Sequence, residues 1–462
     1  MITQTVVVAI SEPAGNIKPL QGVNNGPEGY GSLVDVSPAY RDLAVPYVRL
    51  HDPNWPHPRE VDIPQVFPDF SADPDDPEAY DFRRTDAYLQ KIVDTGARII
   101  YRLGVSIEHT ERKYYTDPPS DFAKWARICL GIVKHYNYGW SGGYRDRVAY
   151  WEVWNEADIG VAMWSGTPEQ YFELYEATSS LLKAYDPGIK VGGPATARYE
   201  PPHPAAAFLE RFLAHCRTHD CPLDFVSWHK YAVDPRIIEA HAHEVRSLLE
   251  RYGYGGVESH LNEWNYGPAD WDIWGAGREL ARRRAFELQK GEVGAAFIAA
   301  TLTLLQDGGV DVATYYDGQP MALFCGLFDY YGVRQKAFYA IRAFRQLLDY
   351  PGRVHAEISG GDAGLRCLAA ADPFTGETAV LLSRFGGEPG PVDVRFDGLP
   401  SDADLTYSVV MVDGESTYAQ VERGYLGHGV SAVTTHLDHH AVALVTAERA
   451  VRSSISELTT DR

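Results

Sequence analysis

Two glutamates at the ends of short apolar runs are the residues of this sequence best suited to do chemistry. Glu156 ends the run WEVWNE, directly after Asn155, and Glu263 ends the run ESHLNE. Cleavage of a glycosidic bond needs one carboxyl group that protonates the leaving oxygen and a second that attacks the anomeric carbon. The two glutamates can supply both groups if the fold brings them together across the 107 positions between them (263 minus 156). The alternative is that each glutamate only pairs with a nearby arginine.

A barrel of parallel strands would bring these glutamates to one place. Eight short apolar or aromatic runs alternate with segments of helical spacing, as expected of repeated βα units. The runs cover residues 20–24, 47–51, 98–103, 149–156, 190–194, 225–231, 258–264 and 311–316. The sequence therefore predicts an α/β fold of the (β/α)8 TIM-barrel type, in which catalytic groups lie at the C-terminal ends of the strands. The two glutamates would end the fourth and seventh strands.

The pattern changes near residue 350, where short alternating strands separated by turns replace the strand and helix order. The segment VDVRF, residues 392–396, places its apolar side chains on one face and its charged side chains on the other. We predict a catalytic barrel over residues 16–349 and an accessory C-terminal β-sandwich over residues 350–450. The N-terminal strand within residues 1–15 is expected to join the sandwich.

Other side chains near strand ends are candidates to tune the two carboxyl groups or to bind a sugar. A nucleophilic carboxylate must be ionised, so we expect a nearby cation, Arg49, and hydrogen-bond donors to hold the pKa of Glu263 down. His229 and Tyr231 are candidate donors to this carboxylate or to the sugar, and all three residues are candidates for the substrate-binding site. Further candidates for sugar contacts are His51, Trp55, Trp264, Tyr315 and Tyr316, because their rings can pack on the apolar face of a sugar. Ordinary packing inside the barrel is the alternative for each of them.

A group of histidines and cysteines resembles a zinc site at first sight. His215, Cys216, His219 and Cys221 lie within seven positions of the chain. Structural zinc sites use ligands on separated knuckles, typically with two to four residues between cysteines, whereas His215 and Cys216 are adjacent. We therefore predict no metal. A glycine-rich phosphate loop between a strand and a helix is missing from the sequence, so we also predict no nucleotide cofactor.

Composition limits the partners of the chain. The formal net charge of -21 opposes binding to nucleic acid or to an anionic membrane surface, and it favours a neutral substrate. Five scattered cysteines do not form the pattern of a disulfide framework. The sequence shows neither a signal peptide nor an apolar segment of the ~18 residues that span a membrane. These features predict a cytoplasmic protein.

Four segments of the chain resemble glycoside hydrolase family 39, and the resemblance extends over about residues 20–345. They are WEVWNEAD, LNEWN, SWHKY and GLFDYYGVRQKAFYAI. The resemblance implies that Glu156 is the acid/base catalyst, that Glu263 is the nucleophile and that Asn155 hydrogen-bonds the 2-hydroxyl of the sugar. The chain departs from the family pattern at Ala157, where a proline often follows the Asn-Glu pair.

The resemblance implies a retaining glycosidase, and we expect an exo-acting enzyme on a small neutral glycoside. A β-xyloside is the first expectation, because that activity is common in the family. Alternatives with the same mechanism are an iduronidase-like enzyme, an arabinose-directed enzyme and an endo-acting glycanase. An alternative from another class is a sugar-binding barrel without catalysis.

Overall fold

The computed structural model describes residues 4–54, 59–197, 207–267, 271–320, 325–360, 363–402, 404–427 and 431–449. The chain divides into two compact units. The barrel unit consists of Lys18–Lys290 and Leu304–Phe338, and the sheet unit consists of Met1–Ile17, Gly291–Thr303 and Tyr339–Arg462.

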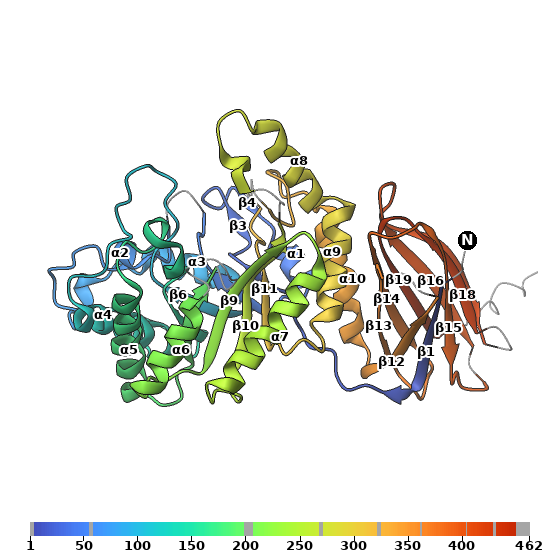
Figure 1. The fold of residues 1–462 in the computed structure, drawn as a ribbon, viewed down its shortest axis with the longest axis horizontal. Helices are drawn as coiled ribbons and strands as arrows, with labels where there is room; N and C mark the ends of the chain where they lie inside the picture. Colours follow the sequence, from blue (N-terminus) through green and yellow to red (C-terminus); the bar gives the residue numbers. More distant parts are fainter. Residues whose placement is uncertain are drawn as a thin grey trace, which may run out of the picture. The chain divides into compact units, whose positions relative to one another are not determined.

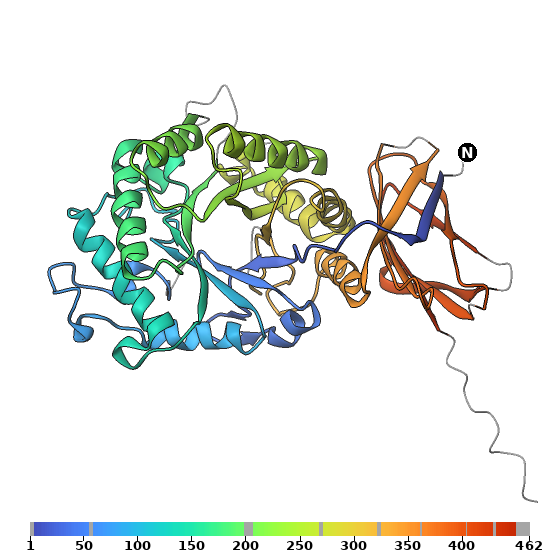
Figure 2. The same ribbon diagram turned by 90° about the horizontal axis from the view of Figure 1, so that it is seen from below.

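The centre of the barrel unit is a closed barrel of eight parallel strands (Figures 1 and 2). In chain order the strands are β2 (Gly22–Asn24), β5 (Tyr47–Leu50), β6 (Arg98–Leu103), β7 (Val148–Val153), β8 (Val191–Thr196), β9 (Phe225–Ala232), β10 (Glu258–Tyr266) and β11 (Val312–Tyr315). Each strand overlaps one of the eight predicted runs. The predicted TIM barrel is therefore confirmed, and β7 and β10 are its fourth and seventh strands.

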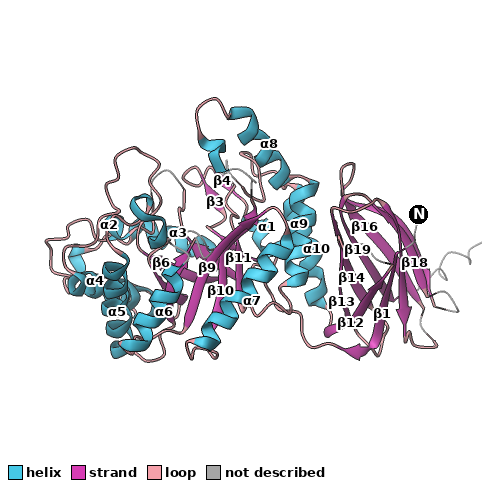
Figure 3. Cartoon of the chain, in the orientation of Figure 1, coloured by secondary structure: helices cyan, strands magenta, loops and turns pink. Residues whose placement is uncertain are grey.

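Helices lie around the barrel strands (Figure 3). They are α1 (Ser37–Asp42), α2 (Ile63–Val66), α3 (Arg83–Val93), α4 (Phe122–Tyr138), α5 (Pro168–Tyr185), α6 (Phe208–Thr218) and α7 (Pro235–Arg251), whereas α8 (Glu279–Lys290) lies above the strands in the view of Figure 3. Local sequence sets their ends. Thr167 and Gln170 form a capping box at the start of α5, and α4 ends at Gly139, whose φ of 76° few other residues adopt. A short hairpin of β3 (Glu28–Gly29) and β4 (Val34–Asp35) follows β2.

Nine strands of the sheet unit form one hydrogen-bonded sheet in the order β17-β16-β19-β14-β13-β12-β1-β15-β18. They are β1 (Gln4–Pro13), β12 (Gly352–Ser359), β13 (Leu365–Ala371), β14 (Thr378–Phe385), β15 (Gly390–Asp397), β16 (Leu405–Val412), β17 (Thr417–Leu426), β18 (Ala432–Leu437) and β19 (His440–Arg449). The N-terminal strand β1 lies between two strands of this sheet, antiparallel to β12 and parallel to β15.

Two helices complete the sheet unit, which includes most of α9 (Glu292–Leu304) and of α10 (Lys336–Gln346). The sequence-based boundary assigned both helices to the barrel. Composition explains the difference for α9, because small and apolar residues cover nearly all of its surface, so the helix is buried on every side. Ser383 of β14 donates a hydrogen bond to the carbonyl of Ala296 at 2.7 Å, which ties α9 to the sheet.

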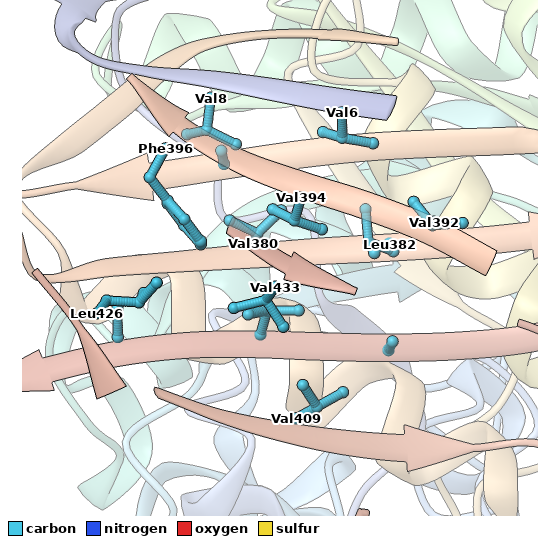
Figure 4. Close-up of a cluster of buried hydrophobic side chains, with 14 of the residues drawn as sticks. Val6, Val8, Val380, Leu382, Val392, Val394, Phe396, Val409, Leu426 and Val433 are labelled. Carbon is cyan, nitrogen blue, oxygen red and sulfur yellow. The ribbon is translucent and has the colours of Figure 1, made fainter. Parts of the chain in front are cut away.

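The core of the sheet unit is almost entirely apolar. Alternate residues of β15, namely Val392, Val394 and Phe396, are buried, and Figure 4 shows them near Val6 and Val8 of β1. Burying a valine, leucine or phenylalanine side chain stabilises a fold by roughly 1.5–3 kcal/mol.

Among the helices that the structure describes, none has both the length and the hydropathy required to cross a membrane.

Candidate active site

Glu156 lies just beyond the end of β7, where the chain adopts an unusual backbone conformation. Trp154 and Glu156 both have positive φ values, of 69° and 46°. The neighbouring strands hold this segment, because Trp154 donates its N–H to Leu103 of β6 at 2.8 Å and Glu156 donates to Ala195 of β8 at 3.0 Å. Left-handed conformations of residues other than glycine cost of order 1–3 kcal/mol and cluster at functional sites. The strands on both sides therefore fix the position of the Glu156 side chain.

Glu263 lies within β10, next to a local irregularity of the barrel. The register between β10 and β9 shifts between Leu261 and Glu263, and Glu263 then pairs with His229. A bulge of this kind re-aims the side chains that follow it. As a result, both Asn262 and Glu263 reach polar partners inside the barrel, since Asn262 hydrogen-bonds Glu152 and Glu263 contacts Arg49.

The carboxyl groups of Glu156 and Glu263 meet at His229. The Nδ1 atom of His229 lies 2.7 Å from Oε1 of Glu156 and 3.5 Å from Oε2 of Glu263. One carboxylate oxygen of each glutamate and one ring nitrogen of His229 all lie within 4.8 Å of one another. The barrel thus brings the two glutamates together, as the predicted strand order requires.

Arg49 organises the polar side chains beneath these glutamates. Its guanidinium group is completely buried and lies 3.2 Å from Oε2 of Glu263 and 2.7 Å from Oε2 of Glu152. The same group donates hydrogen bonds to the side-chain oxygens of Asn155, at 2.6 Å, and Asn24, at 3.1 Å. Because Arg49 binds the oxygen of the Asn155 amide, the NH2 group of that amide is directed elsewhere. It is buried without a hydrogen-bond partner among the described residues.

Burial controls the ionisation of Glu263. Burial raises the pKa of Glu263 above its ordinary value, and the nearby charge of Glu156 acts in the same direction. His229, Arg49 and Tyr231 lower this pKa, and Tyr231 donates its hydroxyl hydrogen to Oε1 of Glu263 at 2.7 Å. The expected partners are therefore in place, but the expectation of a net lowering is wrong because burial outweighs them.

Two of the predicted sugar contacts, His51 and Tyr316, lie beside a carboxyl group that the sequence analysis did not single out. Nε2 of His51 is 3.3 Å from Oδ2 of Asp52, and the Tyr316 hydroxyl donates to the same oxygen at 3.4 Å. Asp52 also accepts the N–H of Ile107 at 2.9 Å, and burial raises the pKa of Asp52 to about 8. Trp55, another predicted contact, lies outside the described residues.

Asp317 is a second carboxyl group that the sequence analysis missed. Its Oδ2 atom accepts hydrogen bonds from Asn25, at 3.1 Å, and Gln319, at 2.9 Å, and burial raises its pKa to about 7. Asp52 and Asp317 each follow directly after the last residue of a predicted strand run. The rule that used strand ends to find the glutamates would have found both aspartates if it had been extended by one residue.

Trp264 and Tyr315 pack against each other instead of beside the two glutamates. Both are completely buried, and their rings meet edge to face with centroids 5.4 Å apart. Successive side chains of a strand point to opposite faces. Thr314 donates to the carbonyl of Asn262 inside the barrel, so the neighbouring Tyr315 points outward. This arrangement supports a packing role for the pair.

The three residues at the centre of the site, Glu156, His229 and Glu263, could also hold a metal ion. Carboxylate oxygens and an imidazole nitrogen within 4.8 Å are compatible with metal ligation. The buried Arg49 guanidinium, however, lies 3.2 Å from the Glu263 carboxylate and already supplies a positive charge there. A divalent cation at the same carboxylate would be repelled by this charge.

The fold and the meeting of two glutamates at the C-terminal ends of the fourth and seventh strands define the class of a barrel glycoside hydrolase. Comparison with known proteins agrees with this class. Residues 39–266 match the model of the family described as glycosyl hydrolases family 39. This match covers just under half of the chain and agrees with the family that the four sequence segments resemble.

Relatives of the chain include two curated proteins and several solved structures. A β-xylosidase from Caldicellulosiruptor saccharolyticus is 30% identical over 171 residues, which cover 34% of this chain and 33% of the relative. A β-xylosidase from Geobacillus stearothermophilus is 31% identical over 176 residues, with 33% of each protein covered. The chain thus spans about a third of the length of the curated relatives it matches. A glucosidase structure from Croceicoccus marinus has a TM-score of 0.80 and 26% identity, and the match covers 98% of this chain and 100% of the other.

Proposed function

We propose that the chain is a retaining glycosidase in which Glu263 is the nucleophile and Glu156 is the acid/base catalyst. The observation that carries the proposal is the convergence of the two carboxyl groups on His229, with oxygens within 4.8 Å of each other. Retaining glycosidases hold their two carboxyl groups about 5–5.5 Å apart, whereas inverting enzymes leave about 6.5–9.5 Å for a water molecule. The short separation supports direct attack by a carboxylate.

The reaction proceeds in two displacements. In the first, a Glu263 oxygen bonds to the anomeric carbon while the bond to the leaving oxygen breaks and Glu156 gives its proton to that oxygen. In the second, Glu156 takes a proton from water, the water oxygen bonds to the anomeric carbon, and the bond to Glu263 breaks. Two inversions restore the original configuration of the sugar.

The partners of Glu263 fit the role of nucleophile. Arg49 and Tyr231 contact different oxygens of its carboxylate and favour the charged form against the effect of burial. The NH2 group of Asn155, which Arg49 directs away from itself, is the proposed donor to the sugar 2-hydroxyl. This hydrogen bond would strengthen as positive charge develops at the anomeric carbon, so it would stabilise the transition state more than the substrate.

A β-xyloside is the first proposed substrate, because both curated relatives carry the name β-xylosidase. A glucoside is the second candidate. It is favoured by the Croceicoccus glucosidase, which this chain matches over nearly the whole length of both proteins. A xylose ring lacks the hydroxymethyl group of glucose, so the two candidates differ in the space that they need beside the anomeric ring.

Hydrolysis of nitrophenyl glycosides tests both parts of the proposal. We expect the wild-type enzyme to hydrolyse nitrophenyl β-xyloside or β-glucoside, with NMR showing that the first-formed sugar has the β configuration. The Glu263→Ala variant should lose at least about a thousandfold in kcat, and added azide should give only a product of inverted configuration. An inverted sugar from the wild-type enzyme would rule out retention, and near-normal turnover by Glu263→Ala would rule out the nucleophile. Binding of glycosides without any hydrolysis would favour the non-catalytic alternative.

A further inference from the structure

A second cluster of chemically reactive side chains lies on the outer helices of the barrel unit. It consists of Glu176 from α5, His215 and His219 at the end of α6, and Cys221 in the turn that leads to β9. Nε2 of His215 lies 2.9 Å from Oε2 of Glu176, and Nδ1 of His219 lies 3.2 Å from the same oxygen. Ligand atoms of Glu176, His215 and Cys221 all lie within 4.8 Å of one another. Glu176, His215 and Cys221 therefore converge on one point, and His219 contacts the same carboxylate oxygen from outside this group of three.

The local backbone explains why these residues meet. His215 and His219 are four positions apart, so they lie on one face of the helix and its first following turn. Asp220 then adopts a left-handed conformation with a φ of 53°, and Cys221 donates its N–H to the carbonyl of Cys216 at 2.9 Å. This turn folds Cys221 back toward the histidines. The argument from spacing considered only neighbours in the sequence, whereas Glu176 is brought in by the packing of α5 against α6.

We propose that Glu176, His215, His219 and Cys221 bind a zinc ion. Imidazole nitrogens, a thiolate and a carboxylate oxygen are the donors that zinc uses, and a structural site takes four of them in a tetrahedron. Zinc bonds of ~2.0–2.3 Å place the donors about 3.3–3.8 Å apart. The two imidazole-to-carboxylate distances of 2.9 and 3.2 Å need to lengthen by less than about 1 Å to meet this geometry.

One side-chain rotation completes the site. The rings of His215 and His219 are stacked, with centroids 4.2 Å apart and an angle of 13° between their planes. Two parallel rings cannot both hold one ion in their planes, so one ring has to tilt when zinc binds. His219 is exposed and free to do so, whereas Cys221 is buried and fixed by its turn. Binding releases the thiol proton of Cys221 to solvent, because the thiolate is the ligand.

The expected role of the ion is structural. The cluster precedes β9, and Asp224 next to it donates its N–H to Val191, the first residue of β8, so it lies toward the N-terminal ends of the strands. His229 lies four residues into β9, about 13 Å further along the strand. Catalysis in a TIM barrel takes place at the C-terminal ends of the strands, so a site at the N-terminal ends supports stability. Zinc would tie α5 to the end of α6 and to the start of β9.

Zinc titration of the whole protein tests the site. The protein is freed of metal with a chelator, kept reduced, and titrated with zinc chloride by calorimetry and against a chromogenic chelator. We expect one equivalent to bind with a Kd below about 1 µM, and cobalt in place of zinc should show the thiolate charge-transfer band of a tetrahedral site. With zinc at about 100 times its Kd, the Tm should rise by at least about 2 °C.

Variants separate this site from adventitious binding. His219→Ala and Cys221→Ser should weaken zinc binding at least about tenfold and remove the rise in Tm. His243→Ala, at an exposed histidine of α7, is the matched control and should bind as the wild type does. The proposal is overturned if the reduced wild-type protein shows no saturable binding, or if both ligand variants bind zinc as tightly as the control. It is also overturned if Cys216 and Cys221 form a disulfide that persists under the reducing conditions, which mass spectrometry of the alkylated chain detects.

Discussion

The interior of the barrel contains buried charged and polar side chains, whereas the interior of the sheet unit is almost entirely apolar. In the barrel, Arg49, Glu152, Asn24 and Asn262 are all completely buried and bonded to one another. In the sheet unit, the buried cluster consists of valine, leucine, alanine and other apolar side chains. Burying paired charges contributes little net stability, since the cost of desolvation offsets their attraction. The barrel interior therefore holds charges in place for chemistry, and the sheet interior holds a fold together.

One buried arginine in each unit makes this contrast concrete. Arg49 binds two carboxylates, those of Glu152 and Glu263. Arg384 of β14 instead donates hydrogen bonds to the carbonyls of Gly390 and Leu437 and to the side chain of Gln4, which joins strands of the sheet. The same residue type thus fixes a charge pattern in one unit and a strand arrangement in the other.

Replacement of Arg49 by methionine should have the largest effect. The Arg49→Met variant leaves the buried Glu152 without its cation, and loss of one partner of a buried pair costs about 3–5 kcal/mol. It also removes the group that orients Asn155 and favours the ionised form of Glu263, so kcat/KM should fall by more than about a hundredfold. Urea unfolding and hydrolysis of the best nitrophenyl glycoside measure the two effects.

Arg384→Met is the matched control for this experiment. It removes hydrogen bonds to neutral partners in the sheet unit, so it should lower the free energy of unfolding and leave the kcat of the folded enzyme within about twofold of the wild type. Equal losses of kcat in the two variants would contradict the division of roles between the two interiors.

A substitution that creates a cavity in the sheet unit tests the role of its apolar core. Leu382 of β14 is completely buried in the sheet core. The Leu382→Ala variant should lose about 2–5 kcal/mol of unfolding free energy, because the removed methyl groups leave a cavity that the core only partly fills. The kcat measured well below the Tm should stay within about twofold of the wild type. A large fall in kcat at an unchanged Tm would show that the sheet core serves the reaction.

The polar interior should also make the free energy of unfolding depend on pH. The raised pKa of Asp52 sets the direction of its contribution. Burial raises its pKa from the ordinary 3.8 to about 8, so the folded chain holds a proton on Asp52 that the unfolded chain has released above pH 4. At this group the folded state binds more protons in this window, so the contribution of Asp52 to the free energy of unfolding falls as pH rises from about 4 to about 8. Burial and the charge of Arg49 hold the pKa of the neighbouring His51 well below its ordinary value. The unfolded chain binds the His51 proton more readily, so His51 contributes the opposite slope below about pH 6.5.

The Asp52→Asn variant should lose this dependence. Asparagine resembles the protonated acid, so wild type and variant should differ least near pH 4, where the unfolded chain begins to hold the proton as well. The variant should gain about 2–4 kcal/mol relative to the wild type between pH 5 and pH 8. Urea unfolding at both pH values measures the difference, with Leu382→Ala as the control that should parallel the wild type. A constant difference between Asp52→Asn and the wild type would contradict the raised pKa.

Much of this molecule could be predicted from the order of its residues. The spacing of apolar residues reveals helices and strands, because each element buries one of its own faces. All eight barrel strands were predicted from this spacing. The assignment of α9 to the sheet unit could not follow from it, because a helix that is apolar all round carries no face that indicates its neighbours.

The site shows the same limit. Strand ends predicted the places of Glu156, Glu263, Arg49 and Tyr231, since the barrel fixes where strand ends meet. The outward direction of Trp264 and Tyr315 depends on the register shift at Leu261, which sequence does not display. Net pKa values depend on burial, and burial depends on the complete packing. Glu176 and His215 are 39 positions apart in the chain, so their approach depends on how α5 packs against α6.

The smallest predicted effect concerns a single hydroxyl group. The Tyr231→Phe variant removes the hydroxyl that donates to Oε1 of Glu263 and leaves the ring in place. The pKa of Glu263, already raised by burial, should then rise further, because a hydrogen bond that favours the ionised form is lost. Because a nucleophilic carboxylate must be ionised, the role proposed for Glu263 implies that the acidic limb of the kcat/KM profile moves to higher pH by the same amount. Tyr101→Phe is the control, since its hydroxyl donates to the carbonyl of Val61 at 3.0 Å. An acidic limb that stays in place in Tyr231→Phe and moves in Glu156→Gln would assign that limb to Glu156 and would contradict the ionisation proposed for Glu263.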